Sequence, residues 1–189
     1  MTMRAVTRAA EGFDRRAFTV NEILRMQDAG IISEDENFEL IEGEIVPMQA
    51  KSHIHELLKS ALSVALARML PKTLWMGFET TIYLSENTFV EPDIVVYPNG
   101  MQLESVRGAD IILAIEVAAT SLAYDRAFKA GLYAKHKFQE YWVVDAPARR
   151  TFQFAGARGK GWRRRREQGP EDVLTHSSLP GFAIRLSDY

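Results

Sequence analysis

The residue with the strongest potential for chemistry is Glu116, a carboxylate within an otherwise apolar run. Residues 110 to 118 are almost continuously apolar, a pattern typical of a strand covered on both faces. An ionised carboxylate is expensive to bury without a compensating charge. We therefore expect a metal ion, a lysine or an arginine beside Glu116. The alternative is that the strand ends at Glu116, so that its side chain faces solvent or pairs with a surface arginine.

A second carboxylate, Asp93, stands at the entry to another predicted strand. It follows Pro92 and precedes the apolar segment 94 to 96. Because Pro-Asp is also a common turn sequence, Asp93 taken alone is more simply explained as a turn residue. Taken with Glu116, it predicts two acids on neighbouring strands.

The helix expected after Glu116 carries three polar residues at intervals of four. Asp125, Lys129 and Tyr133 therefore lie on one stripe of that helix. If the stripe faces the strands, Lys129 is a candidate cation near Glu116. The alternative is a solvated ion pair between Asp125 and Lys129, which would contribute only a few tenths of a kcal/mol.

Composition limits the class of protein. The chain has 189 residues and no cysteine, which fits one domain and excludes disulfides, thiolate metal sites and a cysteine nucleophile. No segment approaches the roughly 18 to 20 apolar residues of a membrane helix. Residues 1–17 contain arginines but no apolar signal-peptide core, so we predict a flexible tail there, a domain at 18–189, and a cytoplasmic protein without membrane contact.

The elements that must position these residues alternate between helices and strands. Apolar spacing and end signals predict helices over 20–29, 52–70 and 122–137. Strands are expected at 38–41, 44–48, 74–84, 89–97, 110–118, 141–144, 151–154, 162–166 and 182–186. The strand-helix-strand unit at 110–144 predicts a parallel pair with a right-handed crossover. The predicted fold class is α/β, a mixed β-sheet flanked by helices with a β-rich C-terminal part.

A Pro-Asp strand, a glutamate in the next buried strand and a following lysine together resemble the PD-(D/E)XK nuclease superfamily. From about residue 18 to 186, the sequence is similar to its restriction-endonuclease-like bacterial branch, the Uma-two family of endonucleases. The nuclease signature alone is weak, whereas the whole ordered series is fairly specific. The resemblance is carried by segments 38–46, 91–96, 115–117, 121–126, Lys129, 133–134, 140–145 and 179–182.

This resemblance implies a role for each matching residue. Asp93 and Glu116 would bind Mg²⁺, for which Mn²⁺ could substitute, with the Val117 backbone carbonyl as a further ligand. Lys129 would stabilise developing negative charge or orient the attacking water. Glu44 would complete the metal shell, although Glu39, Glu42 and Glu56 compete for that place. Supporting roles are implied for Asp125, Tyr133 and His55, the last matching a histidine often found at this point in the family.

The sequence departs from the family pattern at two neighbouring positions. The usual motif has a lysine two residues after the glutamate, where this chain has Ala118. We interpret Lys129 as that lysine, moved to the neighbouring helix. Ala119 stands where this branch often has an acidic or polar residue. If that residue helps bind metal or position Lys129, the chain would be a weakened or inactive nuclease that serves as a nucleic-acid-binding module.

A basic segment near the C-terminal end adds a candidate contact surface. Residues 149 to 166 include eight Lys or Arg and no Asp or Glu. A solvated hairpin rim explains this segment slightly better than nucleic-acid binding does. In the binding alternative, Lys160, Arg163 and Arg165 contact phosphates and Trp162 stacks on a base.

The function predicted from the sequence is Mg²⁺-dependent hydrolysis of phosphodiester bonds in DNA. By family analogy, we expect a homodimer that uses no small-molecule organic cofactor. A carboxylate hydrolase acting on another substrate is the remaining alternative. No Gly-x-Ser-x-Gly motif or convincing catalytic triad in the sequence supports it.

Overall fold

A central six-stranded sheet forms the framework of the protein in a computed structural model, which describes residues 12, 14–33 and 35–189. Its strand order is β10-β9-β8-β7-β6-β3. The strands are β3 (Leu74–Phe78), β6 (Ile94–Pro98), β7 (Leu113–Ala118), β8 (Glu140–Asp145), β9 (Arg150–Arg158) and β10 (Gly161–Gln168). Only β7 and β8 pair in parallel within this sheet. The predicted tail, residues 1–17, falls largely outside the described residues.

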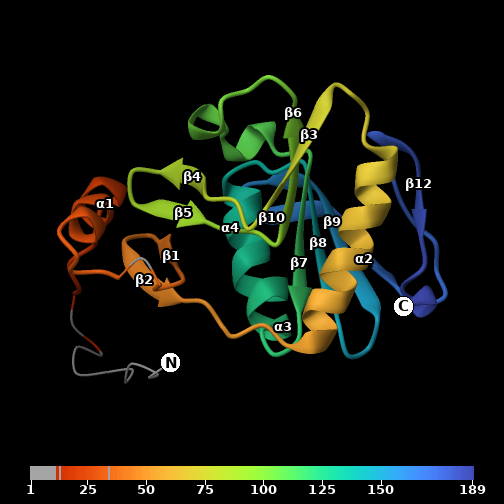
Figure 1. Cartoon of the computed structure of the whole chain (residues 1–189), viewed down its shortest axis with the longest axis horizontal. Helices are drawn as coiled ribbons and strands as arrows, with labels where there is room; N and C mark the ends of the chain where they lie inside the picture. The colour runs from red at the N-terminus through yellow and green to blue at the C-terminus, as the bar shows by residue number, and fades with distance from the viewer. Residues whose placement is uncertain (1–11, 13, 34) are drawn as a thin grey trace.

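Helices cover the two faces of this sheet (Figure 1). On one face, α2 (His53–Met69) packs through Leu58, Leu62 and Leu66. The C-terminal hairpin of β11 (Leu174–His176) and β12 (Leu179–Ile184) packs on the same face. The other face is covered by α3 (Leu122–Tyr124), η3 (Asp125–Lys129) and α4 (Ala130–Lys135). The α/β fold class and the parallel pair predicted from the sequence are therefore confirmed.

A second, four-stranded sheet lies beside the first, toward the N-terminal end of the chain (Figure 1). Its order is β2-β1-β5-β4, formed by β1 (Phe38–Ile41), β2 (Glu44–Pro47), β4 (Ile82–Ser85) and β5 (Thr88–Val90). Helix α1 (Val20–Asp28) packs on it through Ile23, which is fully buried. Thr19 and Glu22 form a capping box at the start of α1. The short 3-10 turns are η1 (Leu103–Ser105), η2 (Gly108–Asp110) and η4 (Leu186–Asp188).

Two of the predicted strands are each divided between the two sheets. Segment 74–84 forms β3 and β4, and segment 89–97 forms β5 and β6. Glu79, with φ of 45°, reverses the first segment, because a left-handed backbone conformation cannot continue a strand. Pro92 stands at the break in the second segment, where its missing N–H cannot support a ladder hydrogen bond. The break places Asp93 at the junction of the two sheets.

The third predicted helix is also not continuous. It contains one turn of π-helix, η3, between α3 and α4. A π-turn inserts an additional residue per turn and therefore rotates the side chains before it relative to those after it. This irregularity falls on Asp125 and Lys129, whose side chains are both buried.

Candidate active site

Glu116 is a buried carboxylate in the middle of the central sheet. Only 6% of the residue is exposed, and β7 continues beyond it to Ala118. The alternative of a solvent-facing residue at the strand end is therefore wrong. Two side chains donate hydrogen bonds to Glu116 Oε1: Lys129 Nζ at 2.9 Å and Tyr133 Oη at 2.8 Å.

Asp93 lies next to Glu116 across the two neighbouring strands. Its Oδ2 accepts a hydrogen bond from the backbone N–H of Val117 at 2.8 Å. It is also 3.1 Å from Nε2 of His55, which projects from the first turn of α2. Asp93 is thus buried and held from both sides, and it does not serve as a simple turn residue.

A third carboxylate, Glu39, reaches this site from the small sheet. Its Oε1 accepts from Lys129 Nζ at 3.0 Å and from the backbone N–H of Glu91 at 2.9 Å. We call Glu39, Asp93, Glu116 and Asp125 the carboxylate cluster. Each of the four residues is at most 6% exposed. Lys129, itself 6% exposed, is the buried ammonium group of this cluster.

The acids of the cluster act strongly on one another. Burial, opposed by the charge of Lys129 and assisted by the neighbouring Asp93 and Glu39 carboxylates, raises the pKa of Glu116 to about 8. Burial alone would lower the pKa of Lys129, but Glu116, Glu39 and Asp125 raise it far above its ordinary value. The lysine is therefore firmly charged, and the cluster carries more potential negative charge than one lysine can neutralise.

Lys129 and Tyr133 reach the same carboxylate oxygen because they stand four residues apart, about one helical turn, on the side of the helix that faces the sheet. Both residues were predicted on one helical stripe with Asp125, and the structure brings all three to the sheet side of the helix. The Asp125 carboxylate is bonded to the hydroxyl of Ser121 at 2.5 Å. Burial raises the pKa of Asp125, while the hydrogen bond from Ser121 and the charge of Lys129 oppose that shift. The alternative of a solvated ion pair between Asp125 and Lys129 is thus wrong, since both residues are buried.

Two basic residues flank Asp93 on the side of α2. His55 contacts Asp93 through Nε2 and Glu56 through Nδ1, the latter at 3.1 Å. Lys51, which precedes the helix, has its Nζ 3.8 Å from Asp93 Oδ1 and 2.6 Å from Glu79. His55 therefore lies where a supporting residue was predicted, whereas Lys51 was missed because no motif marks it.

Glu44 does not take part in this site. It pairs with Ile41 at the turn end of the β1–β2 hairpin, where its exposed carboxylate is 3.4 Å from Arg15. Glu39 occupies the inner end of the same hairpin and points into the cluster. The prediction for Glu44 is corrected accordingly: of the upstream glutamates considered, Glu39 reaches the site, while Glu42 pairs with Lys135 and Glu56 with Lys59.

The basic segment forms the outer hairpin of the sheet, β9 and β10. Lys160, Arg163 and Arg165 are exposed there. Trp162 is instead partly buried, because its indole N–H donates to the carbonyl of Ala130 at 2.8 Å and its ring packs near Tyr141. The prediction that Trp162 stacks on a base is therefore not supported by its position in the core.

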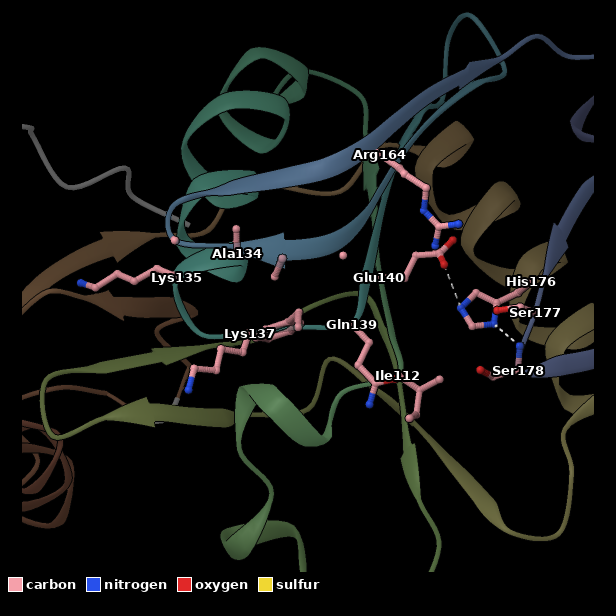
Figure 2. Close-up of a pocket in the computed structure, with 14 residues that line it drawn as sticks. Ile112, Ala134, Lys135, Lys137, Gln139, Glu140, Arg164, His176, Ser177 and Ser178 are labelled. Atoms are coloured by element: carbon pink, nitrogen blue, oxygen red, sulfur yellow. Dashed lines mark hydrogen bonds and ion pairs between the residues drawn. The ribbon is translucent and has the colours of Figure 1, made fainter.

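A pocket with a volume of about 590 Å³ lies at the other end of β7 and β8, away from the carboxylate cluster. Figure 2 shows that Lys135 and Lys137 point out of it and that Arg164 approaches Glu140. Glu140 also lies 3.3 Å from His176, whose Nδ1 accepts from the backbone N–H of Ser178. Glu140, the acid that lines this pocket, thus has partners within the protein, and the pocket lacks the grouped acids of the cluster.

The cluster suits a hard divalent cation by its chemistry. Carboxylate and carbonyl oxygens are the ligands that Mg²⁺ prefers, and a cation would offset the surplus of buried acids. Within the part of the chain that the structure describes, no three or more His, Asp or Glu side chains already form a metal-binding group. A site built from Asp93, Glu116 and the Val117 carbonyl needs only two side chains, with water completing the coordination shell.

The comparisons with known proteins identify first the fold and then the family. The structure is similar to the crystal structure of "a putative nuclease belonging to DUF820" from Anabaena variabilis, with a TM-score of 0.69 and 16% identity, covering 90% of this chain and 96% of that one. The two proteins therefore share a fold. Residues 20–187 match the model of the Uma2 family, described as "Putative restriction endonuclease". The chain belongs to this nuclease family, as its motifs predicted, and no curated protein matches it.

No helix among the described residues is long and apolar enough to cross a membrane.

Proposed function

We propose that this protein is a Mg²⁺-dependent endonuclease that hydrolyses phosphodiester bonds in DNA. The observation that carries the proposal is the pairing of two buried acids from adjacent strands, Asp93 and Glu116, with the buried ammonium group of Lys129. Nothing about packing requires four buried carboxylates around one lysine, since burying unpaired acids destabilises a fold. A site for a divalent cation gives this costly arrangement a purpose.

The chain's own residues would divide the work of such a reaction. When bound, Mg²⁺ supplies a Lewis acid for the phosphate and lowers the pKa of a coordinated water. Asp93 and Glu116 would hold the ion, together with the Val117 carbonyl. Lys129 would stabilise the negative charge that develops on the scissile phosphate.

Three further residues would act by positioning the first three. The Tyr133 hydroxyl fixes Oε1 of Glu116, and His55 with the Val117 N–H fixes Oδ2 of Asp93. Glu39 accepts a second hydrogen bond from Lys129, in addition to the one that Lys129 donates to Glu116. Such supporting hydrogen bonds orient ligands and commonly affect metal affinity or activity by about 10- to 100-fold.

The missing lysine of the family motif does not leave the site without an ammonium group. Ala118 is fully buried in the core, and Lys129 contacts Glu116 from the helix. The sequence departure at this position is therefore compatible with activity. Ala119 keeps open the alternative of a nucleic-acid-binding protein without catalysis, which the following experiment separates from the proposed nuclease.

The test is a nicking assay on supercoiled plasmid DNA with protein in molar excess, run in parallel with and without added Mg²⁺. We expect Mg²⁺-dependent conversion to open circles by the unmodified protein and none by Asp93→Ala, because one of the two metal-holding carboxylates is lost. Glu44→Ala is the matched control and should cleave like the unmodified protein, since Glu44 lies outside the site. Binding of DNA without any cleavage would contradict the proposal and favour the binding module.

A further inference from the structure

A groove lies on the same face of the sheet as the carboxylate cluster, between η3 and the outer hairpin. It has a volume of about 500 Å³. Arg126 of η3 lines one side, and Phe152 and Phe154 of β9 line the floor. Arg165 of β10 lines the opposite side. Arg166 and Glu167 of β10 also line it, and Glu167 is paired with Arg150. A groove with three arginines, one paired acid and an aromatic floor suits an anion that is attached to a larger, partly apolar molecule.

The two arginines are ordered by the aromatic floor. The guanidinium carbon of Arg126 lies 3.6 Å from the centroid of the Phe152 ring, and that of Arg165 lies 6.0 Å from the centroid of Phe154. A guanidinium group stacked on an aromatic face keeps its N–H edge free to donate to phosphate oxygens. The stacking also reduces the entropy that would be lost when the arginines bind a ligand.

The register of the sheet connects this groove to the candidate active site. Glu116 pairs with Val143, and Val143 pairs with Phe152, so the three residues form one row across β7, β8 and β9. Paired residues share a face of the sheet, and neighbouring strands are about 4.8 Å apart. The groove floor therefore begins about 10 Å from Glu116, which a nucleic-acid strand spans in about three nucleotides at about 3.4 Å of rise each.

Arg126 and Lys129 also belong to the same π-turn. Lys129 points from it to Glu116 on one side, whereas Arg126 points to Phe152 on the other. A single short segment thus presents one cation to the candidate cleavage site and another to the groove. Any movement of this segment would shift the two cations together.

We infer that this groove binds the phosphate backbone of the substrate nucleic acid a few nucleotides from the bond to be cleaved. The inference rests on the proposed function and adds a contact surface for the substrate beyond the carboxylate cluster, between η3 and the β9–β10 hairpin. Within the basic hairpin, it assigns the contact to Arg165 and adds Arg126, which no basic run in the sequence marks. Arg164 lies outside the proposed contact. It faces Glu140 on the other side of the sheet (Figure 2).

The test compares two double variants that remove the same charge. The groove variant is Arg126→Gln with Arg165→Gln, and the matched control is Arg158→Gln with Arg164→Gln, both exposed residues of the same hairpin outside the groove. Binding of a fluorescein-labelled 20-base-pair DNA duplex is measured by anisotropy in EDTA, so that cleavage plays no part. Thermal melting verifies that both variants are folded. Polyglutamate serves as a competing acidic polymer without phosphates.

We expect the groove variant to bind at least about tenfold more weakly at moderate salt. The slope of log K against log salt concentration should fall by about 2, because each lost phosphate contact contributes about 0.9. The control variant should change the slope by less than 1. The inference would be overturned if both variants lost the same amount of DNA affinity. It would also be overturned if the unmodified protein did not bind DNA, or if polyglutamate competed as strongly as DNA does.

The outcome separates this inference from the proposed nuclease. Equal binding by both variants, with Mg²⁺-dependent cleavage by the unmodified protein, would reject the groove and leave the nuclease intact. A selective loss of binding in the groove variant, without cleavage by the unmodified protein, would support the groove and reject the nuclease.

Discussion

Replacing Lys129 with methionine should lower the rate of DNA cleavage by about 10²- to 10³-fold, the usual cost of losing one group that stabilises transition-state charge. Methionine keeps the length and apolar stem of the side chain but removes the ammonium group that contacts Glu116 and Glu39. The measurement is the single-turnover rate on plasmid DNA at saturating Mg²⁺. Lys135→Met is the control, because Lys135 is an exposed residue of the next helix, and it should retain activity within about twofold.

The same Lys129→Met substitution should also destabilise the fold. Removing one partner from a buried ion pair leaves the other charge unpaired, at a typical cost of about 3 to 5 kcal/mol. The loss should be smaller at pH 5 than at pH 9, since Glu116 can take up a proton and become neutral at the lower pH. Urea unfolding at the two pH values measures this difference. A folded variant that cleaves DNA within fivefold of the unmodified protein would remove Lys129 from the mechanism.

Binding of Mg²⁺ at pH 7 should release close to one proton. Because the pKa of Glu116 is raised to about 8, most molecules of the metal-free protein carry a proton on this carboxyl at pH 7. A metal ion binds the deprotonated carboxylate, so the proton must leave on binding. Calorimetric titrations in buffers of different ionisation enthalpy measure the number released. That number should decline toward zero by about pH 9.5, and Glu116→Gln should release none.

The raised pKa of Glu116 also fixes the sign of a stability change with pH. The folded state holds this proton more tightly than the unfolded state, whose carboxyl has an ordinary pKa of 4.5. The resulting stabilisation of the metal-free protein is complete below that value and is lost as the pH rises through about 8. The free energy of unfolding should therefore contain a term that falls by at most about 1.4 kcal/mol per pH unit. If Glu116→Gln shows the same pH dependence as the unmodified protein between pH 5 and 8, another group is responsible.

The central part of the site could be predicted from sequence because burial and charge are visible in the local pattern. An acid inside an apolar run requires a partner, and Lys129 and Tyr133 both lie near enough in the chain to supply one. The structure brings both to Glu116 Oε1. Asp93 was harder to interpret, since its burial and its contacts with the Val117 N–H and His55, both distant in sequence, distinguish it from an ordinary Pro-Asp turn.

Glu39 could not be selected from sequence because the contact spans 90 positions between it and Lys129. Its place depends on how the small sheet packs against the large one. That packing follows from the divided strands, which were expected to be continuous. A left-handed Glu79 and the π-turn at Asp125 are likewise backbone features that apolar periodicity does not reveal.

The most direct test of the proposed metal site is a crystal of the protein soaked in Mn²⁺, with data collected to reveal the anomalous signal of the metal. We expect a strong peak bound by carboxylate oxygens of both Asp93 and Glu116, at about 2.0 to 2.6 Å as for hard divalent cations, and no such peak in Asp93→Ala. A crystal that binds Mn²⁺ elsewhere but holds no metal between these two residues would contradict the proposed metal site.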